Sequence, residues 1–288
     1  EMCIRDSSNC ANSGIDVVGV LTQYESVLLN SYVAAGGRWG LDAKDSGVYV
    51  LPPREKADAG LDVYRGTADA ISQNIDFIDS QNPEYLLILS GDHIYKMDYS
   101  EMLRRHKESD AACTISVMEV PWEEASRFGI MSVDGEDMIT EFAEKPRQPK
   151  SNLASMGIYV FSWKALRRYL TEDEADPGSE NDFGKNIIPK MLADGQRMAA
   201  FRFQGYWKDV GTIASFHETS MDLLGNNPEF DLFDKHFPIM SNITTRPPHY
   251  IGPDGRLDDC LVSNGCKIYG TARHSILSVS YTHLTLPT

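Results

Sequence analysis

The sequence has little positive charge and no long apolar run. Lys and Arg together number 27 against 42 Asp and Glu, so the formal net charge is -15. No basic run is present that could follow a phosphate backbone, so a nucleic-acid partner is not expected. No window approaches 18 uncharged apolar residues, and no basic segment followed by an apolar one opens the chain. Neither a membrane span nor a secretory signal is therefore predicted.

Cysteine is also scarce, with five in 288 residues. Neither Cys3 and Cys10 nor Cys260 and Cys266 have the short separation of a zinc knuckle. They predict free thiols in a protein of the reducing cytoplasm. With 42% hydrophobic residues, the chain is long enough to bury a sizeable core in one or two domains.

The two ends of the chain differ in character from the rest. Residues 1–7 and 279–288 resemble translated adaptor sequence. We therefore expect an internal fragment of a longer protein, and leave both ends out of the fold prediction.

Between the ends, short β-rich runs alternate with amphipathic helical patterns. Such an alternation predicts an α/β fold, a doubly wound sheet with right-handed crossovers. A hairpin is expected around Asp134 and Gly135, and the acidic segment 172–178 is expected to be a solvated loop. The expected strands are 17–22, 48–51, 85–89, 113–118, 129–133, 138–142, 156–161 and 198–203, and the expected helices 26–35, 68–78, 99–108, 164–170, 187–193 and 213–224.

The composition shifts near Asn226, which divides the expected domains into 8–227 and 228–278. Beyond this point aliphatic residues and glycines recur at intervals of about six. The period favours the first coils of a parallel β-helix. An irregular β tail is the alternative.

The most informative segment is 85–93, an apolar run followed by Ser90-Gly91-Asp92-His93. Its apolar residues do not alternate with polar ones, so both faces of the strand are expected to be covered, as in a parallel sheet. Ligands of open α/β sheets bind beyond the carboxyl ends of the strands, where Asp92 would offer an oxygen donor. A Gly-Asp turn that merely leaves the strand is the alternative.

Three further segments carry candidate chemistry, and each has an alternative structural interpretation. The glycine turn at Gly66 and Thr67 opens into a helix, where free N–H groups suit an anion or a base edge, but Thr67 could simply cap the helix. Glu144 and Lys145 precede Pro146, so they could bind sugar hydroxyls and a phosphate, or form an exposed ion pair. Asp209 could be the second carboxylate of a magnesium site with Asp92, or a helix N-terminal residue.

In order along the chain, these segments resemble the sugar-nucleotide pyrophosphorylases, and most closely the bacterial glucose-1-phosphate adenylyltransferases. The resemblance covers roughly residues 8–278. The matching segments are Ser8–Gly14, Leu21–Tyr24, Tyr64–Ala70, Ser90–Tyr95, Phe128–Gly129, Glu144–Pro146, Ala154–Tyr159, Asn181–Gly184 and Trp207–Thr212.

The resemblance implies a Rossmann-like doubly wound mixed sheet of the nucleotide-diphospho-sugar transferase type, followed by the start of a left-handed β-helix. It implies transfer of the adenylyl group of ATP to glucose 1-phosphate for glycogen synthesis, in a cytoplasmic, allosteric homotetramer. Mg²⁺ would be held by Asp92 and Asp209, which are also the catalytic residues. The implied glucose 1-phosphate ligands are Tyr64, Gly129, Glu144, Lys145, Ser155, Asp182 and Trp207, and the implied nucleotide ligands Gln23, Gly66 and Thr67.

One departure from the family pattern is large. The family begins with a glycine-rich loop that carries an essential arginine, followed by a Lys-Pro segment, and neither is present. The chain as written is therefore expected to be inactive, while its parent protein is active. A related transferase that uses UTP, dTTP or GTP, and a non-catalytic regulatory subunit, stay as alternatives.

Overall fold

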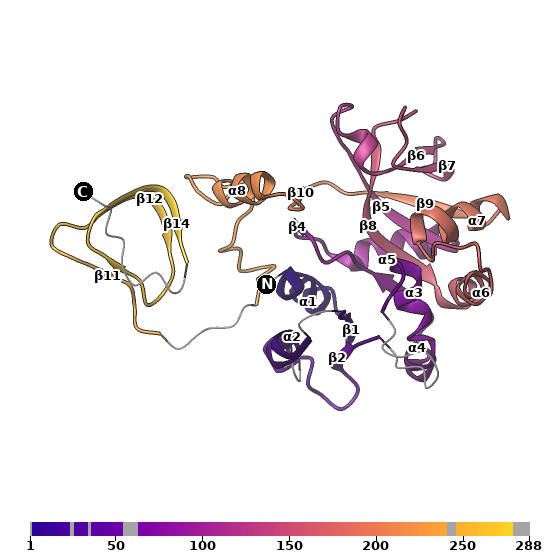
Figure 1. The fold of residues 1–288 in the computed structure, drawn as a ribbon, viewed down its shortest axis with the longest axis horizontal. Helices are drawn as coiled ribbons and strands as arrows, with labels where there is room; N and C mark the ends of the chain where they lie inside the picture. Colours follow the sequence, from indigo (N-terminus) through magenta and orange to yellow (C-terminus); the bar gives the residue numbers. More distant parts are fainter. Residues whose placement is uncertain (1, 24–25, 34–35, 54–62, 241–245, 279–288) are drawn as a thin grey trace. The chain divides into compact units, whose positions relative to one another are not determined.

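The computed structural model describes residues 2–23, 26–33, 36–53, 63–240 and 246–278 (Figure 1). The chain forms two compact units. The larger comprises Asn9–Gly91 and Asp98–Gln204, and the smaller Glu1–Ser8, Asp92–Met97 and Gly205–Thr288. Along the chain, the last passage from the larger unit to the smaller one falls at Gln204–Gly205. The predicted domain boundary at 227 stays a prediction.

The larger unit contains a six-stranded mixed sheet, as the sequence predicts. Its order is β7-β6-β8-β5-β9, with β3 also paired to β8. The β5–β9 pair is parallel, whereas β8 runs antiparallel to β3, β5 and β6. The strands are β3 (Tyr85–Ile88), β5 (Cys113–Glu119), β6 (Gly129–Val133), β7 (Ile139–Glu144), β8 (Leu153–Ser162) and β9 (Met198–Arg202).

Helices cover both faces of this sheet. On β5, Cys113, Ile115 and Val117 join a core built with residues of α6 (Trp163–Glu174), the π-helix η3 (Phe183–Ile187) and α7 (Ile188–Ala193). Thr114 points to the opposite face because side chains alternate along a strand, and it contacts α5 (Tyr99–Glu108). The layering of a doubly wound fold is thereby confirmed.

Helix α5 was predicted with the bounds that the structure shows. Asp98 caps its first turn by accepting a hydrogen bond from the Ser100 N–H, at 2.9 Å. The buried His106 places Nδ1 2.8 Å from Thr114 Oγ1 and Nε2 3.1 Å from Ser162 Oγ. Burial lowers the pKa of His106 to about 4, with a smaller contribution from Lys107.

The prediction of a single helix over 68–78 is wrong. The structure has α3 (Thr67–Ser72) and α4 (Ile75–Gln81). Between them, the side-chain amide of Asn74 donates to Ala70 O at 2.8 Å, and the Asn74 N–H donates to Ile71 O. An Asn side chain that competes for helix carbonyls interrupts the regular ladder, and the hydrophobic period does not reveal it.

The solvated loop expected over 172–178 is only partly correct. Helix α6 continues to Glu174, and Asp173 is buried. Its carboxylate accepts hydrogen bonds from Ser179 Oγ at 2.7 Å and Asn181 Nδ2 at 3.2 Å. The charge is tolerated inside because both carboxylate oxygens have donors, and such partners cannot be foreseen from an acidic run.

The strand predicted over 85–89 was expected to lie in a parallel sheet with both faces covered. The structure differs, because β3 pairs antiparallel with β8 and is half-buried. Parallel pairing occurs between β1 (Val17–Leu21) and β2 (Gly47–Leu51), which form a separate two-stranded sheet. Between these two strands along the chain lie α2 (Ser26–Val33) and η1 (Gly37–Trp39). Helix η2 (Ala125–Arg127) precedes the predicted hairpin, which β6 and β7 confirm.

The smaller unit is built on a short antiparallel ribbon of β4 (His93–Tyr95) and β10 (Trp207–Asp209). Helix α8 (Ile213–Met221) follows, with Thr212 and Ser215 forming a capping box. Helix α1 (Met2–Asn12) runs through residues 2–7, whose foreign origin stays a prediction. Residues 279–288 lie outside the described residues.

The last strands of the smaller unit pair in parallel between successive turns of the chain. Strand β11 (Tyr250–Ile251) pairs with β13 (Lys267–Ile268), and β12 (Arg256–Val262) with β14 (Thr271–Leu277). Cys266, Ile268, Ala272 and Leu277 fill the interior. This arrangement is consistent with the first coils of a β-helix, while their left-handed twist stays a prediction.

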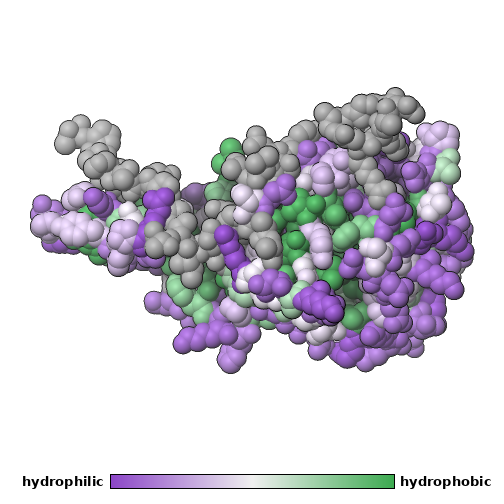
Figure 2. All heavy atoms as spheres, turned by 90° about the horizontal axis from the view of Figure 1, so that it is seen from below, coloured by the Kyte–Doolittle hydropathy of each residue, from purple (hydrophilic) through white to green (hydrophobic). Residues whose placement is uncertain are grey.

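One face of the molecule is drawn by residue hydropathy in Figure 2. Hydrophilic side chains dominate the rim of the face in Figure 2, and hydrophobic ones gather in one area of it.

Among the described residues, Cys10, Cys113, Cys260 and Cys266 are free thiols, as predicted. The described helices include none with the length and apolar character needed to cross a membrane.

We expect His106 to make the protein less stable in mild acid. Between pH 6.5 and about 4, His106 is protonated in the unfolded chain but neutral in the folded one. The free energy of unfolding therefore falls as the pH falls through this range. The full contribution is about 3 kcal/mol. Urea unfolding from pH 7 to 4 would show a shallower pH dependence in His106→Gln. An unchanged dependence would contradict the assignment.

Candidate active site

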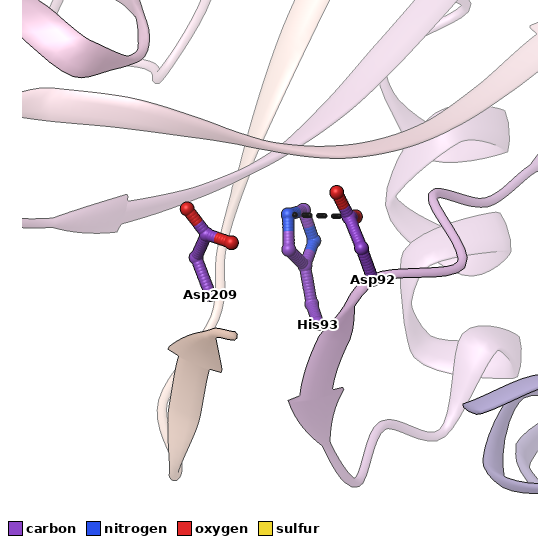
Figure 3. A group of neighbouring side chains, drawn as sticks. All are labelled: Asp92, His93 and Asp209. Carbon is purple, nitrogen blue, oxygen red and sulfur yellow. Dashed lines mark ion pairs between the residues drawn. The ribbon is translucent and has the colours of Figure 1, made fainter. Parts of the chain in front are cut away.

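Two carboxylates and an imidazole converge on the ribbon of the smaller unit (Figure 3). Strand pairing places His93 opposite Asp209, and Asp92 immediately precedes His93. Donor atoms of Asp92, His93 and Asp209 all lie within 4.8 Å of one another. The ribbon therefore brings together the two aspartates that the sequence predicted as one site.

Backbone and ring contacts hold these side chains in place. The Gly211 N–H donates to Asp209 Oδ1 at 3.0 Å, and the Val210 N–H donates to Asp92 O at 3.4 Å. The rings of His93 and Trp207 meet edge to face with centroids 5.1 Å apart. The alternative for Asp209 is wrong, because Thr212 caps α8 and Asp209 ends a strand.

The donor set suits a divalent cation. Adjacent ligands of an octahedral Mg²⁺ lie about 3 Å apart when each bond is about 2.1 Å. The three ligand atoms, which lie within 4.8 Å of one another, would therefore approach each other further on binding an ion. Carboxylate oxygens are the ligands that Mg²⁺ prefers, and the ion usually retains waters or substrate oxygens besides one or two carboxylates. Asp92 and Asp209 would supply the protein oxygens.

In the larger unit, the carboxylate of Glu144 lies between two glycines. An added Cβ would be 2.5 Å from Glu144 Oε2 at Gly184 and 2.9 Å from it at Gly129, closer than real Cβ atoms come. Burial raises the pKa of Glu144 above its ordinary value, against the opposing charge of Lys145. The glycines at 129 and 184 therefore define where this carboxylate can lie.

Lys145 turns outward at the end of β7. Its φ of 46° is left-handed, and its N–H donates to Phe128 O at 3.1 Å. Its Nζ is 3.8 Å from Glu144 Oε1, and its side chain is 66% exposed against 24% for Glu144. The ion pair that was the alternative is present, but it pairs an exposed cation with a half-buried anion.

The glycine turn at 66–67 is joined to the segment 181–183. The Ala68 and Asp69 N–H groups donate to Asn181 O, so these two are not free for an anion. Gly66 precedes α3 as its N-cap, and Thr67 is the first helical residue, so Thr67 is not the cap. Thr67 Oγ1 instead donates to Asp182 Oδ2 at 3.0 Å.

Asp182 itself holds the start of the π-helix. Its Oδ1 accepts hydrogen bonds from the Gly184 and Lys185 N–H groups, at 2.9 and 3.0 Å. The Phe183 N–H donates to Thr67 Oγ1 at 3.1 Å. Since its oxygens already accept these bonds, Asp182 acts first as a support for the backbone near Glu144.

Two other predicted ligands have hydroxyls engaged within the fold. Tyr64 donates to Leu51 O at 2.8 Å, and Ser155 Oγ accepts from the Gly157 N–H at 3.2 Å. Burial raises the pKa of the nearby Tyr159 well above its usual range. Gln23 follows β1 and is exposed.

The predicted residues thus fall into two groups, each within one unit. Asp92, Trp207 and Asp209 belong to the smaller unit, whereas Gly66, Thr67, Gly129, Glu144, Lys145, Ser155 and Asp182 lie in connected segments of the larger one, which also contains Gln23 and Tyr64. The prediction did not name His93, although it lies inside the matched segment Ser90–Tyr95 and belongs to the cluster with Asp92 and Asp209. Its position next to Asp92 in the sequence was the available signal.

We expect Gly184→Ala to displace the Glu144 carboxylate, because the new methyl group overlaps Oε2. Overpacking costs about 1–3 kcal/mol, and greater exposure would lower the raised pKa of Glu144 toward its ordinary value. Carboxyl NMR titration and thermal unfolding measure both effects. Gly135→Ala is the matched control, since no described atom lies within 4 Å of its added Cβ. A wild-type Glu144 pKa after Gly184→Ala would refute the contact.

Comparison with known proteins bears on this site. The chain matches the nucleotidyl transferase family over residues 2–226. It is 56% identical over 270 residues to the glucose-1-phosphate adenylyltransferase of Desulforamulus reducens. The aligned region covers 94% of this chain and 67% of that protein. The enzyme of the same name from Geobacillus stearothermophilus is 55% identical, with 94% and 70% covered.

A third relative, the glucose-1-phosphate adenylyltransferase of Clostridium novyi, is 54% identical over 270 residues, 94% of this chain and 70% of its own length. These relatives agree in name and in the extent of the match. The chain is therefore a member of the nucleotidyl transferase family, similar throughout most of its length to the glucose-1-phosphate adenylyltransferases.

Proposed function

We propose that this protein transfers the adenylyl group of ATP to glucose 1-phosphate, releasing pyrophosphate and supplying ADP-glucose for glycogen synthesis. The observation that carries the proposal is the convergence of Asp92 and Asp209 on one ribbon. The names of the relatives support the two substrates. The intact protein is proposed to be a cytoplasmic homotetramer under allosteric control.

The reaction needs positioning and charge neutralisation more than covalent chemistry. A phosphate oxygen of glucose 1-phosphate attacks the α-phosphorus of ATP. The new P–O bond forms as the bond to the bridging oxygen breaks, and the electron pair leaves with pyrophosphate. Mg²⁺ supplies charge neutralisation at the reacting phosphates when it is bound, and Asp92 and Asp209 would hold it.

The larger unit offers groups suited to the sugar phosphate. The exposed ammonium of Lys145 can neutralise the phosphate, and Glu144 can accept hydrogen bonds from sugar hydroxyls. Gly129 and Gly184 keep room for that carboxylate, while Asp182 supports the backbone beside it. Tyr64 and Ser155 are proposed as further glucose 1-phosphate ligands of the larger unit, and Trp207 stays a proposed ligand on the strength of the family resemblance alone.

The nucleotide is proposed to contact Gln23 and the turn at Gly66 and Thr67. Gln23 is exposed at the end of β1, and side-chain amides can both donate to and accept from a base edge. Thr67 uses its hydroxyl within the fold, so the turn would contribute its shape and backbone.

Turnover by the full-length protein tests the function directly. Pyrophosphate release with glucose 1-phosphate and Mg²⁺ is expected to be fastest with ATP, and slower with UTP, dTTP or GTP. Asp92→Asn should reduce turnover at least about 100-fold while the circular dichroism spectrum is unchanged. Preferential use of UTP would overturn the ATP assignment, and near-normal activity of Asp92→Asn at saturating Mg²⁺ would overturn the metal site.

Lys145→Gln should weaken binding of glucose 1-phosphate by about 10- to 100-fold. The estimate follows from the loss of a hydrogen bond between charged groups, worth about 1.5–3 kcal/mol. Isothermal titration calorimetry of this chain measures the affinity. The matched control is Lys150→Gln, which removes another exposed lysine that pairs with Glu141 of β7. Equal affinities for the two variants would remove Lys145 from the site.

A further inference from the structure

His93 lies close to the two predicted metal ligands, Asp92 and Asp209. The sequence did not predict His93 itself as a ligand. Its Nε2 is 3.2 Å from Asp92 Oδ1. In the view of Figure 3 its ring lies between the carboxylates of Asp92 and Asp209. The pairing of β4 with β10 produces this arrangement, because His93 and Asp209 are opposite one another.

The imidazole is held more firmly than the carboxylate it contacts. The side chain of His93 is 12% exposed and packs edge to face on Trp207, whereas that of Asp92 is 57% exposed. An exposed carboxylate has several rotamers, and fixing one of them costs conformational entropy. A contact from a restrained ring reduces that cost before a cation arrives.

We propose that His93 is a positioning residue whose imidazole, with Nε2 3.2 Å from Asp92 Oδ1, orients the Asp92 carboxylate toward the divalent cation without binding the cation itself. The inference rests on the proposed function, because it assumes that Asp92 and Asp209 hold the cation. With Oδ1 contacted by His93, Oδ2 of Asp92 would be the oxygen left to hold the cation. Groups that orient a metal ligand in this way commonly change metal affinity by about 10- to 100-fold.

Direct ligation by His93 is the competing arrangement. A separation of 3.2 Å between Nε2 and Asp92 Oδ1 is also near that of adjacent ligands of one ion. The two arrangements differ in the position of one hydrogen, since a ligand must present a bare Nε2 and an orienting group must carry a hydrogen there. Preference for oxygen ligands favours the orienting role with Mg²⁺.

Mn²⁺ is a suitable probe because it replaces Mg²⁺ at oxygen sites and is visible by electron paramagnetic resonance. Titration of this chain with Mn²⁺ gives the affinity without any requirement for turnover. His93→Ala is expected to weaken Mn²⁺ binding about 10- to 100-fold, and His93→Gln, which retains an N–H donor, to recover much of the loss. Electron spin echo measurements on the wild-type complex should show no coupling to a directly bound ¹⁴N.

His217→Ala is the matched control, since it removes an exposed imidazole from α8 of the same unit, and it should leave Mn²⁺ affinity unchanged. A direct ¹⁴N coupling that disappears in His93→Ala would overturn the proposal in favour of ligation. Unchanged affinity in a folded His93→Ala, with loss of binding in Asp92→Asn, would overturn the role of His93 and keep the metal site. Unchanged binding in Asp92→Asn as well would overturn the metal site too.

Discussion

The hydrogen bonds of the Asp182 carboxylate are the constraint on which the larger unit's part of the site depends. One oxygen accepts from the N–H groups that begin the π-helix, and the other accepts from Thr67. The π-helix then brings Gly184 against the Glu144 carboxylate. Asp182 is partly buried, so the loss of these donors would leave its carboxylate only partly solvated, and the bonds order the three segments together. Glu144 has a defined position because Asp182 holds its neighbour.

In the smaller unit, the carboxylates of Asp92 and Asp209 lie close together. Carboxylates that approach one another repel, and the repulsion grows as solvent is excluded. Asp92 and Asp209 are nevertheless within reach of a single ion, with the His93 ring against Asp92. The ribbon that carries them is short, and the Gly211 N–H stabilises Asp209 from its own backbone. The cation proposed for this site would relieve the repulsion between the two carboxylates.

Local sequence patterns predicted the elements well where local forces decide them. Helix α5 has a capping aspartate and an amphipathic period, and the hairpin of β6 and β7 has a clear turn at Asp134. The predictions were wrong where one side chain found a distant or competing partner. Asn74 bonds to Ala70 O and divides a helix, and Asp173 is buried by donors from Ser179 and Asn181. Neither partner is visible in a hydrophobic pattern.

The sequence by itself determined the α/β class, the acidic and cysteine-poor character, and the resemblance that the family match confirmed. It also determined which carboxylates and glycines are candidates, because those residue types limit the possible chemistry. Only the tertiary structure decided that His93 lies against Asp92, that Asp182 supports Gly184, and that β3 pairs antiparallel. The reason is physical: composition and period report on local conformation, whereas these contacts join residues through strand pairing and backbone geometry. Register between strands as distant as β4 and β10 is an outcome of the whole fold.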